Sequence, residues 1–376
     1  MSEEHQSLTR AELLKLGGAG AAGLSLYLSG GSALAARMRS AAAGSTEGVT
    51  LNWLTWFDHY FPQQLTYTKK KTGIGCRTKL APSDSQIYTT IRTTGSQFDI
   101  AAMDALWVPK AHKDGLTESF DLSSIPASKQ LYSDARNISI WKDGSNTMAY
   151  PNGWSTIQVY YNPKFVKTKP DSYHALLDPK YKGKIVYENS PETMMAFGGL
   201  ATGAKQPYDL TIPEIARAKA WLKQWKPNIL KLVNQNTETV TALKDESAWI
   251  GLGNLGVELR VKAAGGPPIK VAYPKEGLLG WFDGEQKVAK SKHKDVFEQF
   301  MDSVEGQTAW IAKNFIANGR PMFNEKAYKL LVNQGYKARA DAFNYTKPEL
   351  IFKAHLQGPS KNPQAITDAF NEVFGG

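Results

Sequence analysis

Residues 278–290 read LLGWFDGEQKVAK, and the interpretation of the whole sequence depends on them. They place Trp281, Phe282 and Asp283 between two glycines. A flat indole beside a carboxylate suits a cationic amine, because the ring face attracts the cation by about 0.5–2 kcal/mol and the carboxylate accepts charge-assisted hydrogen bonds. The alternative is a core tryptophan followed by a helix-capping aspartate, since aromatic side chains mostly bury area. The surrounding sequence favours the amine pocket.

Composition is that of an ordinary globular protein. The chain has 376 residues, of which 42% are hydrophobic and 21% charged, so we expect about two domains. Cys76 is the single cysteine, which excludes an intramolecular disulfide and a CxxC metal site. The six histidines show no HxxxH or HExxH spacing, so we expect neither a metal nor another cofactor.

The net charge of +10 raises the question of an anionic partner. Basic residues are scattered, however, and the run Lys69–Lys71 follows a helical pattern, where a solvated helix end explains it. The sequence contains no zinc finger, RNP-like motif or arginine-rich arm. We therefore expect no nucleic-acid partner.

The first 43 residues have the pattern of a secretory signal peptide. Arg10 and Lys15 precede LGGAGAAGLSLYLSGGSALAA, a short uncharged segment ending in a small-residue cleavage site. The start resembles a twin-arginine export signal in which Ala11 replaces the second arginine, so the export route stays open. A buried N-terminal helix is the alternative, but each glycine costs such a helix about 1 kcal/mol. We expect a soluble mature protein in the periplasm, beginning between residues 36 and 48.

From residue 49 onwards, strand and helix patterns alternate. The expected order is strand 49–53, helix 61–71, strand 76–80, helix 83–94 and strand 98–103. Such a βαβαβ order predicts a parallel sheet that binds ligands beyond the carboxyl ends of its strands. The residues at these ends are Trp56, Phe57, Asp58 and Asp104.

Four segments together resemble the extracellular solute-binding proteins of the spermidine/putrescine-binding type. They are WFDHYFPQQL at 56–65, PNGWSTIQVYYN at 151–162, DPKYKGKI at 178–185 and YPKEGLLGWFDGEQKVAK at 273–290. The similarity covers residues 49–374. Any one segment alone is weak, whereas DPKYKGKI with PKEG and a Trp-Phe-Asp run is fairly specific.

The resemblance implies an α/β periplasmic binding protein fold of type II. Each lobe would be a mixed sheet flanked by helices, with the ligand between the lobes. Residues 49–156 and 281–318 would form the first lobe, and residues 157–280 and 319–376 the second, with the last crossing near 318–321. The protein, expected to be a monomer, would close about its hinge on a small amine and deliver it to an ABC permease with its ATPase.

The resemblance also implies a set of ligand-binding residues, with some departures from the family pattern. Asp104 stands at a serine position, Asn189 where an acid is usual, and Gly253 or a neighbour where a second tryptophan would stand. A long polyamine would lose one ion pair at Asn189 and one aromatic wall near Gly253, so these departures disfavour it. The candidates are Trp56, Phe57, Asp58, Asp104, Ser155, Thr156, Asn189, Glu192, Trp281, Asp283 and Arg320.

Three of these candidates have open interpretations. Arg320 would meet a ligand carboxylate with a bidentate fork, which suits an ω-amino acid such as γ-aminobutyrate, or it would form an ordinary salt bridge. Ser155 and Thr156 would contact ligand or merely satisfy backbone groups at the hinge.

An exported hydrolase is the competing class of protein. The carboxylates of Asp58, Asp104, Glu192 and Asp283 would then supply a general acid and base. The sequence lacks GxSxG, a Cys/His nucleophile and a phosphate-binding GxxxxGK[ST] loop. We therefore expect a binding protein and not an enzyme.

Overall fold

The computed structural model describes residues 48–375, apart from residues 82, 235, 319–320 and 344–348. The predicted signal peptide and the candidate Arg320 therefore lie outside the described residues. Within the described ranges, no helix combines the length and the apolar character needed to cross a membrane.

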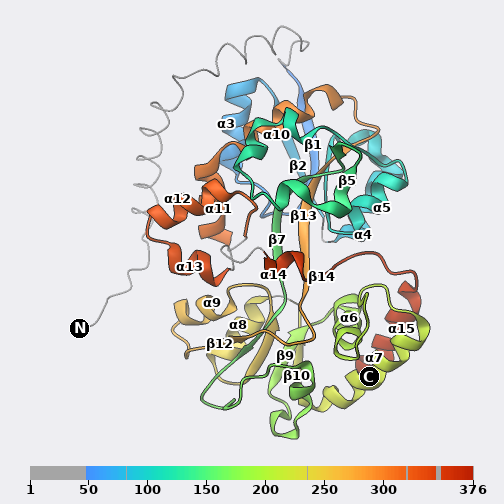
Figure 1. The fold of residues 1–376 in the computed structure, drawn as a ribbon, viewed down its shortest axis with the longest axis vertical. Coiled ribbons are helices and arrows are strands. Elements are labelled where there is room, and N and C mark those ends of the chain that lie inside the picture. The colour runs from blue at the N-terminus through green and yellow to red at the C-terminus, as the bar shows by residue number, and fades with distance from the viewer. Residues whose placement is uncertain (1–47, 82, 235, 319–320, 344–348, 376) are drawn as a thin grey trace.

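Two large hydrophobic cores divide the described chain. One contains Trp53 and Phe282, and the other contains Phe197 and Trp225. Figure 1 shows the two corresponding lobes, one above the other, joined by strands that run between them. The predicted α/β fold with two lobes is confirmed.

The first lobe is built on a mixed sheet of seven strands. They are β1 (Thr50–Thr55), β2 (Gly75–Leu80), β3 (Ile100–Asp104), β4 (Thr117–Glu118), β7 (Tyr150–Thr156), β13 (Leu279–Val288) and β14 (His355–Leu356). The main path runs β14-β13-β3-β1-β2, with β4 and β7 also paired to β13. β1 is parallel to β2 and β3, whereas β13 is antiparallel to β3 and β7.

Helices surround this sheet and confirm the predicted βαβαβ order. They are α3 (Pro62–Thr72), α4 (Asp84–Thr94), α5 (Trp107–Lys113), α10 (Phe297–Glu305), α11 (Thr308–Asn318), α12 (Glu325–Asn333), α13 (Lys337–Ala342) and α14 (Glu349–Phe352). A short hairpin joins β5 (Lys142–Asp143) to β6 (Asn146–Thr147). Ser83 caps α4 by accepting a hydrogen bond from the Gln86 N–H, which fixes Asp84 in the first turn.

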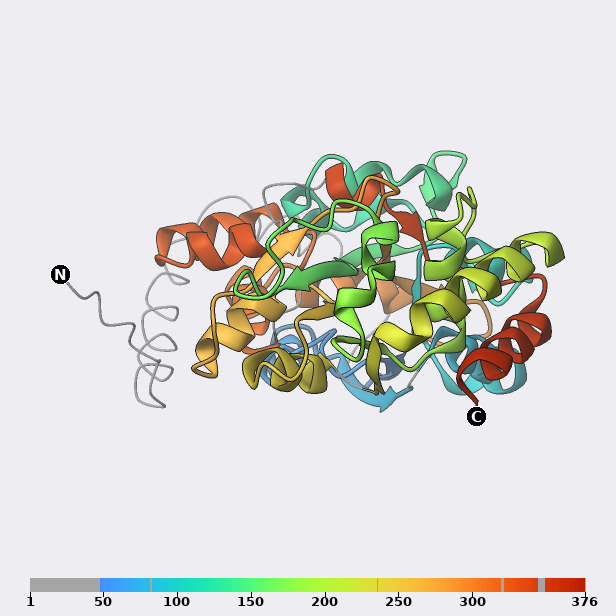
Figure 2. The same ribbon diagram turned by 90° about the horizontal axis from the view of Figure 1, so that it is seen from below.

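The second lobe has a five-stranded sheet in the order β10-β9-β11-β8-β12. These strands are β8 (Gln158–Tyr161), β9 (Ile185–Glu188), β10 (Ile229–Val233), β11 (Ile250–Gly253) and β12 (Lys270–Ala272). Its helices are α6 (Pro191–Ala201), α7 (Ile212–Trp225), α8 (Asn236–Lys244), α9 (Val257–Ala263) and α15 (Pro363–Phe374). α15 packs on α6 and α7, away from the pair α8 and α9 (Figure 2).

Two of the crossings between the lobes lie where the sequence predicts them. Trp154 on β7 belongs to the first core, and Ile157 just before β8 belongs to the second. On β13, Leu279 belongs to the second core and Phe282 to the first. The chain therefore leaves the first lobe at residues 155–157 and returns at residues 280–282.

The third crossing lies later than predicted. Residues 321–323 add to the edge of β7, because the Trp154 N–H donates to the Pro321 carbonyl (3.3 Å) and the Phe323 N–H to the Asn152 carbonyl (3.1 Å). Side chains as far as Ile351 stay in the first core. Among the described residues, the chain therefore crosses to the second lobe after Ile351, through β14, and not at the expected boundary of residue 319.

Gly280 lies where all three crossings meet. It pairs with Thr156 of β7 on one side and with Leu356 of β14 on the other. A Cβ atom at Gly280 would lie 2.9 Å from the Ser155 carbonyl oxygen and 3.0 Å from Ala354 Cβ. The absence of a side chain therefore lets three crossing segments form one narrow ribbon.

Gly284→Ala is expected to destabilise the first lobe by about 1–3 kcal/mol, because the added methyl group overpacks the core. Its Cβ would lie 2.6 Å from Ala149 Cβ and 2.7 Å from Trp141 Cη2. Denaturant unfolding measures the effect. A midpoint equal to that of the unsubstituted protein would contradict this packing.

Candidate functional site

β13 presents its polar side chains to one face of the first sheet. Successive residues of a strand point to opposite faces, so Trp281, Asp283 and Glu285 share one face. Phe282 points the other way, and its ring lies 5.0 Å from that of Trp141. Trp281 is half-buried and packs against the second core, whereas Asp283 and Glu285 are buried. The predicted indole and carboxylate therefore lie side by side at the junction of the lobes.

Two further aspartates adjoin Asp283. Asp104 ends β3 directly opposite Asp283 in the antiparallel register, so their side chains share a face. Asp84 begins α4, and its Oδ1 accepts a hydrogen bond of 2.7 Å from the Asp104 N–H. We call Asp84, Asp104 and Asp283 the aspartate cluster; their exposed fractions are only 4–6%.

Burial governs the electrostatics of the aspartate cluster. It raises the pKa of Asp84, and it raises the pKa of Asp283 against the lowering effect of a hydrogen bond with Asp104. Burial, together with the charges of Asp84 and Asp283, holds the pKa of Asp104 well above its usual value. Three carboxyl groups coupled in this way do not all ionise near neutral pH without a cation.

The loop after β1 carries three predicted site residues. The half-buried Trp56 packs its ring 4.9 Å from that of His59. Phe57 is 67% exposed. Asp58 is half-buried, its carbonyl accepts a hydrogen bond from Asn314 Nδ2 (2.8 Å), and its charge contributes to the raised pKa of Asp283. The structure therefore brings Trp56 and Asp58 to the aspartate cluster and leaves the Phe57 ring in solvent.

Carboxylates of the second lobe approach the same region. Glu188 ends β9 and Glu192 lies in the first turn of α6, where it also complements the helix dipole. Both side chains have exposed surface, yet surrounding protein and the charge of Glu192 raise the pKa of Glu188. The buried Tyr208 has a raised pKa because of burial, then the charges of Glu188 and Asp104. Charged acids from both lobes therefore lie near enough to Tyr208 to raise its pKa.

The remaining described candidates contribute less to this arrangement. Ser155 lies opposite Trp281 in the β7–β13 register and shares its face. Thr156 is fully buried on the other face, where its Cγ2 lies against Gly280. Asn189 is exposed, and its Nδ2 donates to Asn234 Oδ1 (3.3 Å). Thr156 is therefore a buried residue at the crossing, and its hydroxyl oxygen accepts a hydrogen bond from Gln158 Nε2 (3.5 Å).

Sequence reasoning missed Asp84, Glu285 and His59. Asp84 follows a serine cap and reads as a first-turn helix residue, so only the packing of α4 on β3 reveals its contact. Glu285 follows Asp283 by two residues, and the strand period alone places it on the same face. His59 has no neighbouring residue at the spacing of a metal-binding motif, so the sequence gives no indication of its role.

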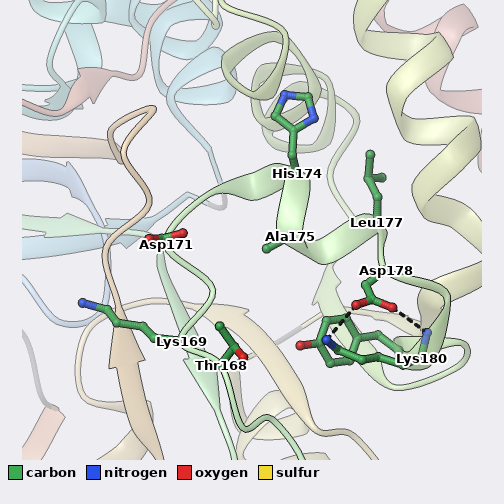
Figure 3. A pocket seen from close by; sticks show the side chains of 9 residues that line it. Thr168, Lys169, Asp171, His174, Ala175, Leu177, Asp178 and Lys180 are labelled. Atoms are coloured by element: carbon green, nitrogen blue, oxygen red, sulfur yellow. Dashed lines mark hydrogen bonds and ion pairs between the residues drawn. The ribbon is translucent and has the colours of Figure 1, made fainter.

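A cavity of about 510 Å³ lies elsewhere, within the second lobe. Figure 3 shows its lining between residues 168 and 181, including His174 and Asp178. Asp178 is already paired with Lys180 Nζ at 2.7 Å. This cavity contains no predicted site residue. Among the described residues, no group of three or more His, Cys, Asp and Glu side chains could hold a metal ion.

Comparison with known proteins identifies the class. The family model described as bacterial extracellular solute-binding protein matches residues 66–341. The chain belongs to this family, and it is a substrate-binding component of an ABC transporter rather than an enzyme. The exported-hydrolase hypothesis is therefore set aside.

The individual relatives have low sequence identity to this chain, as three examples show. The chain is 25% identical over 263 residues to the spermidine/putrescine-binding periplasmic protein of Escherichia coli K12, covering 68% of this chain and 72% of that protein. It is 24% identical over 296 residues to the putrescine-binding periplasmic protein PotF of the same organism, covering 73% and 78%. The structure of the spermidine/putrescine substrate-binding protein PotD from Streptococcus pneumoniae has a TM-score of 0.67 at 22% identity, covering 87% and 98%.

Proposed function

We propose that this protein captures a small amine, a polyamine such as putrescine or spermidine or a related compound, between its two lobes. The observation that carries this proposal is the buried aspartate cluster next to Trp281. Three carboxyl groups with raised pKa values are costly to ionise in an empty site, and an ammonium ion lowers that cost. An anionic ligand would add to the repulsion.

Asp104 supplies a specific acceptor for this ligand. Its Oδ1 is buried, and it has no hydrogen-bond donor among the described residues. Buried polar atoms nearly always have a partner, so an ammonium N–H is a chemically suitable donor here. Asp104 would then replace the acid that the family pattern has at the position of Asn189.

Ligand contacts from both lobes would exist together only when the lobes are closed. Asp283 and Asp104 would hold one end of the amine, with Glu188 and Glu192 facing it from the second lobe. Trp281, which lies at the crossing itself, would cover its methylene groups and attract the cation by about 0.5–2 kcal/mol. Binding would therefore shift the population towards the closed form, which the permease would recognise.

Similarity to periplasmic relatives also supports the proposed route and destination. Residues 1–43 would direct export and be removed, and the mature protein would act in the periplasm beside its permease and ATPase. The N-terminal sequence of the protein isolated from the periplasm tests this.

A panel of matched ligands tests the proposed function. Putrescine and spermidine are expected to raise the melting temperature, because a ligand at 100 times its Kd adds about 2.7 kcal/mol of stability. The neutral 1,4-butanediol has the length of putrescine and is expected to have no effect. Butyrate, which lacks the amine of γ-aminobutyrate, is the second control.

The panel also separates the two ligand classes. Stabilisation by γ-aminobutyrate well beyond that by putrescine would favour the ω-amino acid alternative. Stabilisation by butyrate and by no amine would contradict the proposed function. Calorimetric titration of each active compound then supplies its Kd.

A further inference from the structure

A buried histidine lies against the carboxylate of Asp283. His59 is 2% exposed, and its Nδ1 lies 2.5 Å from Glu285 Oε1. Its Nε2 lies 3.6 Å from Asp283 Oδ2. The Trp53 indole N–H donates to the other Glu285 oxygen, Oε2, at 2.7 Å. The imidazole therefore stands between two carboxyl groups on the same face of β13.

Hydrogen-bond chemistry limits the number of protons in the unit formed by His59, Glu285 and Asp283. The contact between Nδ1 and Glu285 needs one proton, which either group can carry. With that proton alone, a bare Nε2 would face an ionised Asp283, and two lone pairs would oppose each other. A second proton, on Nε2 or on Asp283, removes this repulsion. The approach of Nε2 to Asp283 Oδ2 at 3.6 Å therefore favours two protons among His59, Glu285 and Asp283 in the ligand-free site.

The surroundings favour keeping the second proton. The titratable groups around the unit are Asp58 in the same loop, Cys76 on β2, Asp84 on α4, Asp104 on β3 and Glu305 on α10. Burial raises the pKa of Glu285 and of Glu305, and the charge of Glu285 raises that of Glu305 further. Neighbouring acids stabilise an imidazolium ion, whereas a second cation close by destabilises it.

We propose that His59 is a positioning residue that holds a proton against Asp283 in the empty site and releases it when a cationic ligand binds. The inference rests on the proposed function, because it requires an ammonium group at Asp283. The ammonium brings one positive charge to the carboxylate, and the proton leaves for the solvent, so the net charge of the site is unchanged. Amine affinity then rises with pH, and His59 sets the pH range of that rise.

Proton counting by calorimetry tests the role of His59. Putrescine is titrated into the protein at about pH 6.5 in phosphate and in ACES, two buffers with different ionisation enthalpies. The difference in heat gives the protons released per ligand bound. The number of protons released is expected to differ between the unsubstituted protein and His59→Gln, because in the variant the second proton can lie only on Asp283 and follows the pKa of that carboxyl group. His174→Gln, at an exposed histidine of the second lobe, is expected to match the unsubstituted protein.

Two further measurements separate this role from a purely structural one. Glu285→Gln removes the carboxylate that holds Nδ1, and it is also expected to change the number of protons released on binding. Nitrogen NMR of histidine-labelled, ligand-free protein should show one imidazole, absent from His59→Gln, whose signals move when putrescine is added.

The outcomes distinguish the two proposals. Equal proton release by the unsubstituted protein and both variants, with putrescine still bound, would overturn the role of His59 and leave the proposed function standing. If putrescine and the other amines of the panel fail to bind the unsubstituted protein, the proposed function falls and the inference falls with it. A His59→Gln variant that does not fold leaves the decision to Glu285→Gln and to NMR.

Discussion

Replacing Asp283 with asparagine is expected to weaken amine binding by about 2–5 kcal/mol, because a neutral amide no longer offsets the desolvation of the ammonium ion. This corresponds to a Kd that rises roughly 30-fold to several-thousand-fold. The side chain is only 5% exposed, so little water is available to compensate. Asparagine has nearly the same shape and retains the strand pairing of β13. Calorimetric titration with putrescine measures the loss.

Asp295→Asn provides the matched control for this substitution. Asp295 is an exposed aspartate of the first lobe, outside the aspartate cluster, and its replacement removes the same charge from the protein. The Kd of this variant should equal that of the unsubstituted protein. An Asp283→Asn protein with full affinity would remove Asp283 from the ligand site.

Phe282→Ala is expected to lower the free energy of unfolding by about 3–5 kcal/mol, since it leaves a large cavity in the first core. Phe282 is 2% exposed, and its ring centroid lies 5.0 Å from that of Trp141, 6.2 Å from that of Phe352 and 6.3 Å from that of Phe323. The denaturant midpoint of the first lobe measures the effect.

Phe57→Ala is the control for the same change of residue type. Phe57 is 67% exposed, so removing its ring should alter the free energy of unfolding by no more than about 0.5 kcal/mol. Equal midpoints for the two variants would show that Phe282 contributes no more than a surface ring. The two variants therefore test whether Phe282 points into the core while its neighbours Trp281 and Asp283 point to the site.

Local patterns predicted most of the fold. The helices expected at 61–71 and 83–94 appear as α3 and α4, since their caps and apolar spacing are local signals. The boundary of the second lobe was not predictable in this way. A β-like stretch at residues 321–323 fits either lobe, and only its pairing with the edge of β7 places it in the first.

The candidate site was predicted in part for a similar reason. Trp281, Asp283 and Asp104 follow from strand ends and from family resemblance, and the structure brings them together. His59 has no such signal, because its role depends on Glu285, which lies 226 residues further along the chain. A contact of such sequence separation leaves no local pattern, so it emerges only from the packed structure.

The ribbon at Gly280 has a mechanical consequence. Three hydrogen-bonded segments lie edge to edge there, and bending across their common flat face keeps their backbone pairs intact. The lobes should accordingly open by bending of this narrow ribbon, about one dominant axis. A movement that slides the segments past one another would break the pairing of β13 with β14, which consists of Leu279 with His355 and Gly280 with Leu356.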